Sequence, residues 1–289
     1  MQNIPKKDIS DEIPPLRVGQ STLRGFRLQS YIFLNALMFY TRISIPKWIK
    51  LGNVPYNDEM LNKATIYFPV IGWIVGGICA FVFYMSSFVF PNNPEISILL
   101  SMAAGVLTTG AFHEDGFADV CDGFGGGWTQ TKILEIMKDS RVGTYGSVGL
   151  ILIFGLKFFS LEVLDNQTLI CTLIVAHSLS RFVALSFIFT LNYVREDALS
   201  KAKPIAKKLP LNDLLIALIL AILPLFIYII ITKNFFLLLM IPPLVLLHSY
   251  LGYYFKKWIG GYTGDCLGAT QQLAEVIIYL VVVAISQNT

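Results

Sequence analysis

The chain of 289 residues is 55% hydrophobic and only 14% charged, whereas a soluble domain has roughly 25% charged residues. This composition excludes an ordinary soluble domain, and the formal net charge of +3 is too small to indicate a nucleic-acid partner. The four cysteines are scattered without a C-x-x-C pair, so we expect free thiols.

The N-terminal region is polar and basic, and no cleavable signal peptide is visible in it. We predict that residues 1–27 form a cytoplasmic tail and that residues 28–289 form a single transmembrane catalytic domain. The first apolar stretch, 28–45, contains Asn35 and Arg42. The stretch could span the membrane or enter it and return. A re-entrant or interfacial helix is favoured because the distribution of basic residues requires segments 1–27 and 46–63 to share a side.

Further along the chain, apolar stretches recur with about the 20 residues that a helix needs to cross a bilayer. They are residues 66–90, 96–112, 145–164, 168–191, 213–232, 235–255 and 267–286. The sequence therefore predicts an all-α, polytopic integral membrane protein. We expect about seven transmembrane helices in the lipid bilayer, plus the re-entrant or interfacial N-terminal helix.

The distribution of basic residues predicts the orientation of these helices. If residues 113–143 are cytoplasmic, 18 of the 22 Lys and Arg residues lie on the cytoplasmic side. They belong to the segments 1–27, 46–63, 113–143, 192–212 and 256–266. We therefore expect a multi-pass protein of the cytoplasmic (inner) membrane, with its active site facing the cytoplasm.

The stretch "HEDGFADVCDGFGGGW", residues 113–128, concentrates acidic residues against this apolar background. If the helix that begins near residue 96 continues through it, Asp115, Asp119 and Asp122 share one face. Each pair of these carboxylates would repel by roughly 2–3 kcal/mol at a separation of about 6 Å. A divalent cation with oxygen ligands removes that repulsion, so the pattern favours a metal such as magnesium over a solvated acidic loop.

The residues after the acids add groups that suit a phosphate. Gly125 and Gly126 would let a ligand approach the backbone closely. The following "TQTKILEIMKDSRVGTYG", residues 129–146, predicts an amphipathic helix that carries acids and cations together. Acids for a metal beside cations for a phosphate favour metal-assisted phosphoryl transfer, although surface pairing alone could explain the cations.

These motifs together resemble those of the cobalamin synthase family, the adenosylcobinamide-GDP ribazoletransferases. The resemblance rests on "HEDGFADVCDG", "EIMKDSRVGTYG" and "GGYTGDCLGATQQLAE", and it extends from "FYTRISIP" and "YFPVIGW" through "AHSLSR". It implies a membrane enzyme that joins adenosylcobinamide-GDP to α-ribazole, or to α-ribazole 5′-phosphate. This enzyme would release GMP in the last steps of cobalamin biosynthesis, with Mg2+ as the ion.

Roles can be assigned to individual residues on this basis. The predicted metal ligands are Asp115, Asp119, Asp122 and Asp139. The general base is left open among Asp139, Glu135 and Asp265. The predicted substrate-binding residues are His113, Gly125, Gly126, Lys138, Arg141, Arg42, His177, Arg181 and Gln271.

Two basic residues fall inside predicted spans, where a charge is costly unless it is paired or faces a cavity. Lys157 lies mid-span, and we expect it to pair or to extend towards the interface. Arg181 lies on the same helical face as His177, so contact with a substrate phosphate or with the acidic helix is the sharper interpretation.

Two other functions fit parts of the pattern. A membrane phosphotransferase of the CDP-alcohol phosphatidyltransferase type would share the metal site and act on another substrate. A divalent-cation transporter is less favoured, because transporters hold ions near the middle of the bilayer on repeated helices. A homo-oligomer, or association with other corrinoid-pathway enzymes, is compatible with the sequence.

Overall fold

The computed structural model describes residues 20–45, 58–194 and 209–288. Most of the predicted tail and parts of two predicted cytoplasmic segments lie outside the described residues. The helices are α1 (Gln20–Tyr40), α2 (Asp58–Ala64), α3 (Phe68–Val89), α4 (Pro94–Thr109), α5 (Phe112–Gly126), α6 (Gln130–Ile136), α7 (Thr144–Glu162), α8 (Asn166–Thr190), α9 (Leu211–Thr232), α10 (Ile241–Ile259) and α11 (Gly264–Ser286). Two short 3-10 turns, η2 (Thr65–Tyr67) and η3 (Phe235–Met240), lead into α3 and α10.

The helices long and apolar enough to cross a membrane confirm the predicted class of fold. Within the described residues six segments meet this description, and a seventh follows if the bent pair of α4 and α5 counts as one span. Their bounds lie within a few residues of the predicted stretches. The prediction of an all-α, polytopic membrane protein is therefore confirmed.

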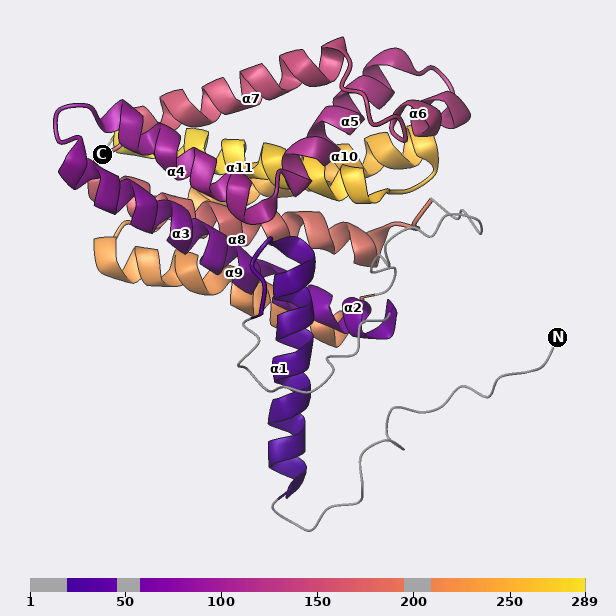
Figure 1. Ribbon diagram of the computed structural model, residues 1–289, viewed down its shortest axis with the longest axis horizontal. Helices are drawn as coiled ribbons and strands as arrows, with labels where there is room; N and C mark the ends of the chain where they lie inside the picture. The colour runs from indigo at the N-terminus through magenta and orange to yellow at the C-terminus, as the bar shows by residue number, and fades with distance from the viewer. Residues whose placement is uncertain (1–19, 46–57, 195–208, 289) are drawn as a thin grey trace.

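The spanning helices run side by side in a bundle, with α8 and α11 near its centre (Figure 1). α3 packs closely on α8 because Gly72 and Gly76 have no side chains. A Cβ at either position would overlap the backbone of α8, and small residues are common where membrane helices cross. α1 is not among the spanning segments and runs across the direction of the bundle. Its course agrees with a first helix that does not cross the bilayer.

A sharp break separates α4 from α5, and it corrects one prediction. Gly110 and Ala111 both adopt left-handed backbone conformations, with φ of 68° and 58°. The two helices therefore meet at a bend of 88°. The acidic stretch is helical as expected, but it does not continue the helix that begins near residue 96. The break turns the acidic helix away from the axis of its preceding span.

The segment after the acidic helix also differs from its prediction. Instead of one amphipathic helix over 129–146, α6 covers only Gln130–Ile136 and α7 begins at Thr144. Gly123 allows Met137 and Ile133 to pack directly on α5. The short helix therefore folds back against the acidic helix.

Candidate functional site

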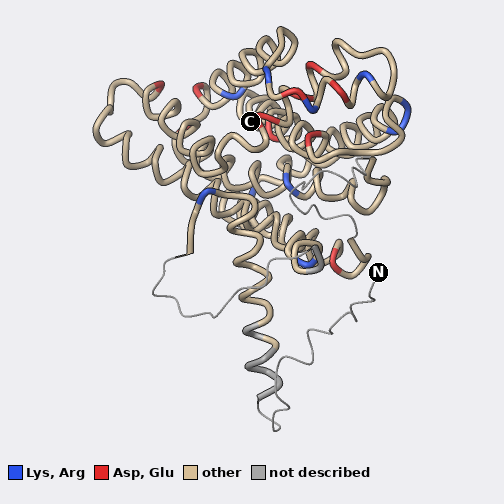
Figure 2. Tube along the Cα trace, turned by 45° about the vertical axis from the view of Figure 1, so that its right-hand side comes forward, with Lys and Arg blue, Asp and Glu red and all other residues tan. Residues whose placement is uncertain are grey.

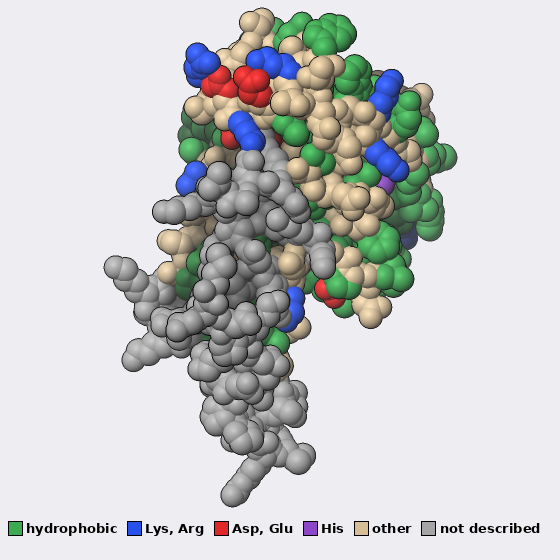
Figure 3. Space-filling model, turned by 90° about the vertical axis from the view of Figure 1, so that its right-hand side faces the viewer, with side chains coloured by type: hydrophobic (Ala, Val, Ile, Leu, Met, Phe, Trp, Pro, Cys, Tyr) green, Lys and Arg blue, Asp and Glu red, His purple; other side chains and the backbone are tan. Residues whose placement is uncertain are grey.

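The acidic helix α5 has two chemically different sides. Asp115 is exposed, and Asp119 and Asp122 are partly buried along the same side of the helix. His113 and Glu114 point into the protein and are almost completely buried. Acidic positions gather at this end of the bundle (Figure 2), and Figure 3 shows Asp and Glu side chains beside Lys and Arg on that end.

The close crossing of α5 and α11 brings the backbone of Asp265 against α5. A side chain at Gly116 would overlap the backbone of Asp265, and one at Gly268 would press on the backbone of His113. Gly116 lies between Asp115 and Asp119 in the sequence. The structure thus brings the backbone of one predicted base candidate against α5 at Gly116, although the two residues are far apart in sequence.

Asp122 is held by a different set of partners. Its carboxylate accepts hydrogen bonds from the backbone N–H groups of Gly143 at 2.7 Å and Gly146 at 2.9 Å. These groups belong to the start of α7, where a negative charge is favourable. In this structure Asp122 therefore serves as a cap that ties α7 to α5.

The capping role gives a testable result. Asp122→Ala should lower the free energy of unfolding by about 1–2 kcal/mol, because the α7 amides lose their acceptor. Thermal unfolding of the purified protein in detergent measures this change. If Asp122→Ala kept the melting temperature of the parent protein, the capping assignment would be contradicted.

The acids and cations around α6 pair with one another on an exposed surface. Lys132 Nζ lies 3.1 Å from Glu135 Oε1, and Arg141 binds Asp139 with Nη2–Oδ2 at 2.6 Å. The hydrogen bonds from Arg141 hold the pKa of Asp139 at about 2. A carboxylate with so low a pKa accepts a proton poorly near neutral pH, which weighs against Asp139 as the general base.

The predicted metal ligands are not all brought together. Within the part of the chain that the structure describes, no three or more His, Cys, Asp or Glu side chains are grouped so that they could hold a metal ion. Magnesium, however, is usually held by one or two carboxylates together with substrate phosphates and water. Asp115 and Asp119 stay predicted ligands of such an ion, and the carboxylates of Asp122 and Asp139 bind the α7 amides and Arg141 respectively.

The predicted phosphate-binding glycines are used for packing. The ring of Tyr145 lies against Gly125, and the Ile136 side chain lies near Gly126. Lys138 is exposed beyond α6, and the Arg42 side chain covers Gly110 at the break between α4 and α5. Of these residues, Arg42 lies nearest the start of the acidic helix.

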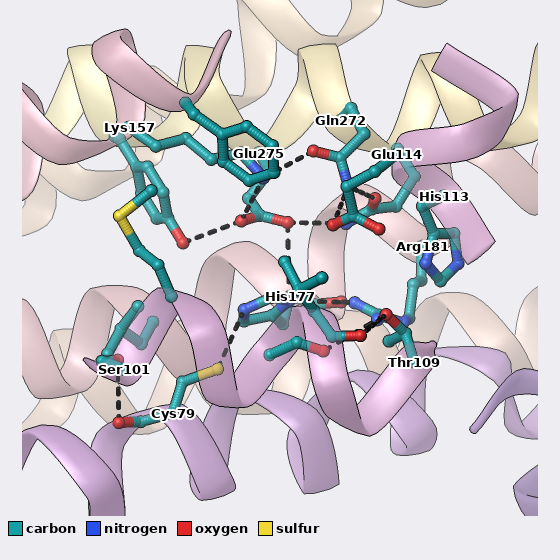
Figure 4. Close-up of a pocket in the computed structure, with 17 residues that line it drawn as sticks. Cys79, Ser101, Thr109, His113, Glu114, Lys157, His177, Arg181, Gln272 and Glu275 are labelled. Carbon is teal, nitrogen blue, oxygen red and sulfur yellow. Dashed lines mark hydrogen bonds and ion pairs between the residues drawn. The ribbon is translucent and has the colours of Figure 1, made fainter. Parts of the chain in front are cut away.

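A network of buried polar side chains lies behind α5, among the spanning helices (Figure 4). Glu275 is at its centre. Its Oε1 lies 2.9 Å from Lys157 Nζ and accepts a hydrogen bond from Tyr279 at 3.0 Å. Its Oε2 accepts one from Gln271 at 2.6 Å. Lys157 also donates to Gln272 at 2.6 Å, so the network joins α7 to α11.

The same network reaches α8 and α5. Arg181 is only 1% exposed, and its Nη1 donates to the backbone oxygen of His177 at 2.9 Å. Gln272 donates to Glu114 Oε1 at 3.0 Å. Glu114 Oε2, Arg181 Nε and His113 Nε2 are buried without a hydrogen-bond partner. The network contains two acids, Glu114 and Glu275, and two basic residues, Lys157 and Arg181. Their charges balance, which lowers the cost of burying them in a membrane interior.

The space enclosed by these groups limits what they can bind. The cavity measures about 30 Å³, which is room for about one or two water molecules. Lys157 is paired, as expected, and Arg181 does not extend to the interface. His177, Arg181 and Gln271 are brought together in the buried network. That network contacts α5 through the hydrogen bond from Gln272 to Glu114. Contact between these residues and substrate stays a prediction.

Fold and site together define a polytopic helical membrane protein that carries a carboxylate-rich site at one end of its bundle. Residues 32–283 match the family described as Cobalamin-5-phosphate synthase, and the chain belongs to this family.

Similar proteins support the same assignment. A protein of Shewanella frigidimarina is 45% identical over 269 residues, covering 89% of this chain and 95% of its own length. One from Shewanella woodyi is 46% identical over 270 residues, covering 90% and 98% respectively. Both are named adenosylcobinamide-GDP ribazoletransferase. No solved structure matches the chain.

Proposed function

We propose that this protein joins adenosylcobinamide-GDP to α-ribazole, or to α-ribazole 5′-phosphate, and releases GMP. The observation that carries the proposal is the contact of the Asp265 backbone with Gly116, which lies between Asp115 and Asp119 in the sequence of α5, in a chain of this family. The family membership favours this reaction over that of a CDP-alcohol phosphatidyltransferase or a divalent-cation transporter.

The proposed reaction is the attack of a ribose hydroxyl on a phosphorus atom. A new O–P bond forms to the phosphate on the aminopropanol arm of the corrinoid, the bond to GMP breaks, and GMP departs with the electron pair. A bound magnesium ion would neutralise charge on the phosphate oxygens. Asp115 and Asp119 would hold that ion, since they are four positions apart and share one side of α5.

Asp265 is the favoured acceptor of the hydroxyl proton among the three candidates. Its backbone touches α5 at Gly116, whereas Glu135 and Asp139 pair with cations on the exposed α6 segment. The backbone contact of Asp265 and the ion pairs of Glu135 and Asp139 thus support an assignment that the sequence left open.

The direct test is an assay of the purified full-length protein in lipid nanodiscs. With adenosylcobinamide-GDP, α-ribazole and magnesium, we expect release of GMP in step with corrinoid product. Omission of α-ribazole should stop this release. Release of CMP from a CDP-alcohol, or metal flux into proteoliposomes, without GMP release would support the competing functions instead.

The proposal places the site on the cytoplasmic face of the inner membrane, and labelling tests this placement. A cysteine at Lys132, on exposed α6, should react with an impermeant maleimide only from the cytoplasmic side. A cysteine at Asn166, the first residue of α8, should react only from the non-cytoplasmic side. The parent protein controls for its four native cysteines. Reversed labelling of the two positions would overturn the orientation.

A further inference from the structure

A second cavity adjoins the buried polar network at His113, which lines both spaces, and it lies at the start of α5. It measures about 50 Å³ and is lined mainly by rings from three helices: Phe39, Tyr40, Phe68, Phe112 and His113. Aliphatic side chains and glycines of α8 and α11 complete its wall: Leu185, Ile188, Gly264, Leu267 and Gly268. A cavity with so many aromatic rings suits a flat, largely apolar group.

The aromatic rings of this cavity form stacked and edge-to-face pairs. Tyr40 and Phe68 stack with ring centres 4.1 Å apart and planes inclined by 26°. Phe68 and His113 are nearly parallel at 5.8 Å and 21°, while Phe39 and Phe112 meet edge to face at 5.8 Å. Such walls favour another aromatic ring through stacked and edge-on contacts.

The cavity adjoins the groups assigned to the chemistry. Phe112 precedes Asp115 and Asp119 by three and seven positions on α5, so the three side chains share one side of the helix. Gly264 directly precedes Asp265 in the sequence. If an aromatic base bound in the cavity, the ribose attached to it would therefore lie near the acidic side of α5 and near Asp265.

The side chain of His113 is the polar group that we use to compare an aromatic base with few polar atoms and one with many. His113 is 2% exposed, and its Nε2 has no hydrogen-bond partner. A guanine base needs several donors and acceptors around its edge, which these aromatic walls do not supply. A benzimidazole ring carries a single free ring nitrogen and two apolar faces, so it matches the cavity better.

We infer that this cavity binds the benzimidazole ring of the ribazole substrate and directs its ribose towards Asp265. The inference rests on the proposed function for the identity of the substrate. Phe112 lies at the mouth, being 41% exposed. At about 50 Å³ the closed cavity has room for only a few water molecules, so the inference requires the Phe112 ring to swing outward before the base can enter.

The test separates a ring from an aliphatic side chain at the mouth. Phe112→Leu should raise the KM for α-ribazole at least about fivefold, the lower end of what loss of one stacking contact costs. Its kcat and its KM for adenosylcobinamide-GDP should stay within about twofold. Phe112→Tyr should keep the parent KM. Phe159→Leu, at a 65% exposed phenylalanine of α7, is the matched control.

Direct binding distinguishes failure of the cavity from failure of the reaction. Equilibrium dialysis of α-ribazole, without corrinoid, should show weaker binding to Phe112→Leu than to the parent or Phe112→Tyr. This result would support the cavity even if no GMP were released. An unchanged KM and unchanged binding in Phe112→Leu would overturn it, even in a fully active enzyme.

Discussion

Replacing Asp119 by Asn should reduce GMP release on the order of 100-fold or more while leaving the protein folded in its membrane. The substitution keeps the size of the side chain and removes the charge that would hold magnesium against the substrate phosphate. Folding should not suffer, because the neighbouring carboxylates repel one another when no cation is bound.

The comparison is made with purified protein at saturating substrate over a range of magnesium concentrations. The matched control is Glu162→Gln, at an exposed carboxylate at the far end of α7, which should keep parent activity. Near-normal turnover of Asp119→Asn at low magnesium would contradict the role of this carboxylate.

Removing the central acid of the buried network should have the largest effect on stability. Glu275→Ala leaves Lys157 charged and unpaired, and it takes an acceptor from both Tyr279 and Gln271. Breaking a buried ion pair from one side typically costs about 3–5 kcal/mol. We therefore expect a marked fall in the thermal unfolding temperature in detergent.

A double variant separates lost pairing from lost volume. Lys157→Met combined with Glu275→Gln removes both charges and retains most of the packing, so it should recover much of the stability lost in Glu275→Ala. An unfolding temperature for Glu275→Ala equal to that of the parent would show that the pair does not hold the bundle. If the double variant were stable but inactive, the network would have a part in the reaction itself.

The spanning helices could be predicted well because length and hydropathy alone define them. α9 was expected over 213–232 and occupies Leu211–Thr232. The break between α4 and α5 could not be predicted, because Ala111 is an ordinary helix former. It takes a left-handed conformation here only through its tertiary surroundings. The bend depends on contacts such as Arg42 on Gly110, which lie far apart in sequence.

Only the part of the candidate site that depends on local sequence could be predicted. The period of the helix placed Asp115 and Asp119 on one side, and the buried charge of Lys157 indicated that it needed a partner. Nothing in the spacing identified that partner as Glu275. The acidic pattern likewise could not show that Asp122 is occupied by the amides of α7.

The aromatic cavity gave no sequence signal that separates it from ordinary core. Phe39, Phe68 and Phe112 come from three distant helices, and each alone looks like a packing residue. Only the fold brings their rings to one wall beside α11. Isolated aromatic residues in an apolar chain are too common to indicate a binding site.

The contact between α5 and α11 also fixes when the site can exist during synthesis. α5 ends at residue 126 and α11 begins at residue 264, so the ribosome makes the acids long before it makes Asp265. Until the last helix inserts, Glu114 lacks its contact with Gln272, and the acids face water with no base beside them. If Asp265 accepts the proton as proposed, a nascent or C-terminally shortened chain lacks that group, and we expect activity only once the final span is in the membrane.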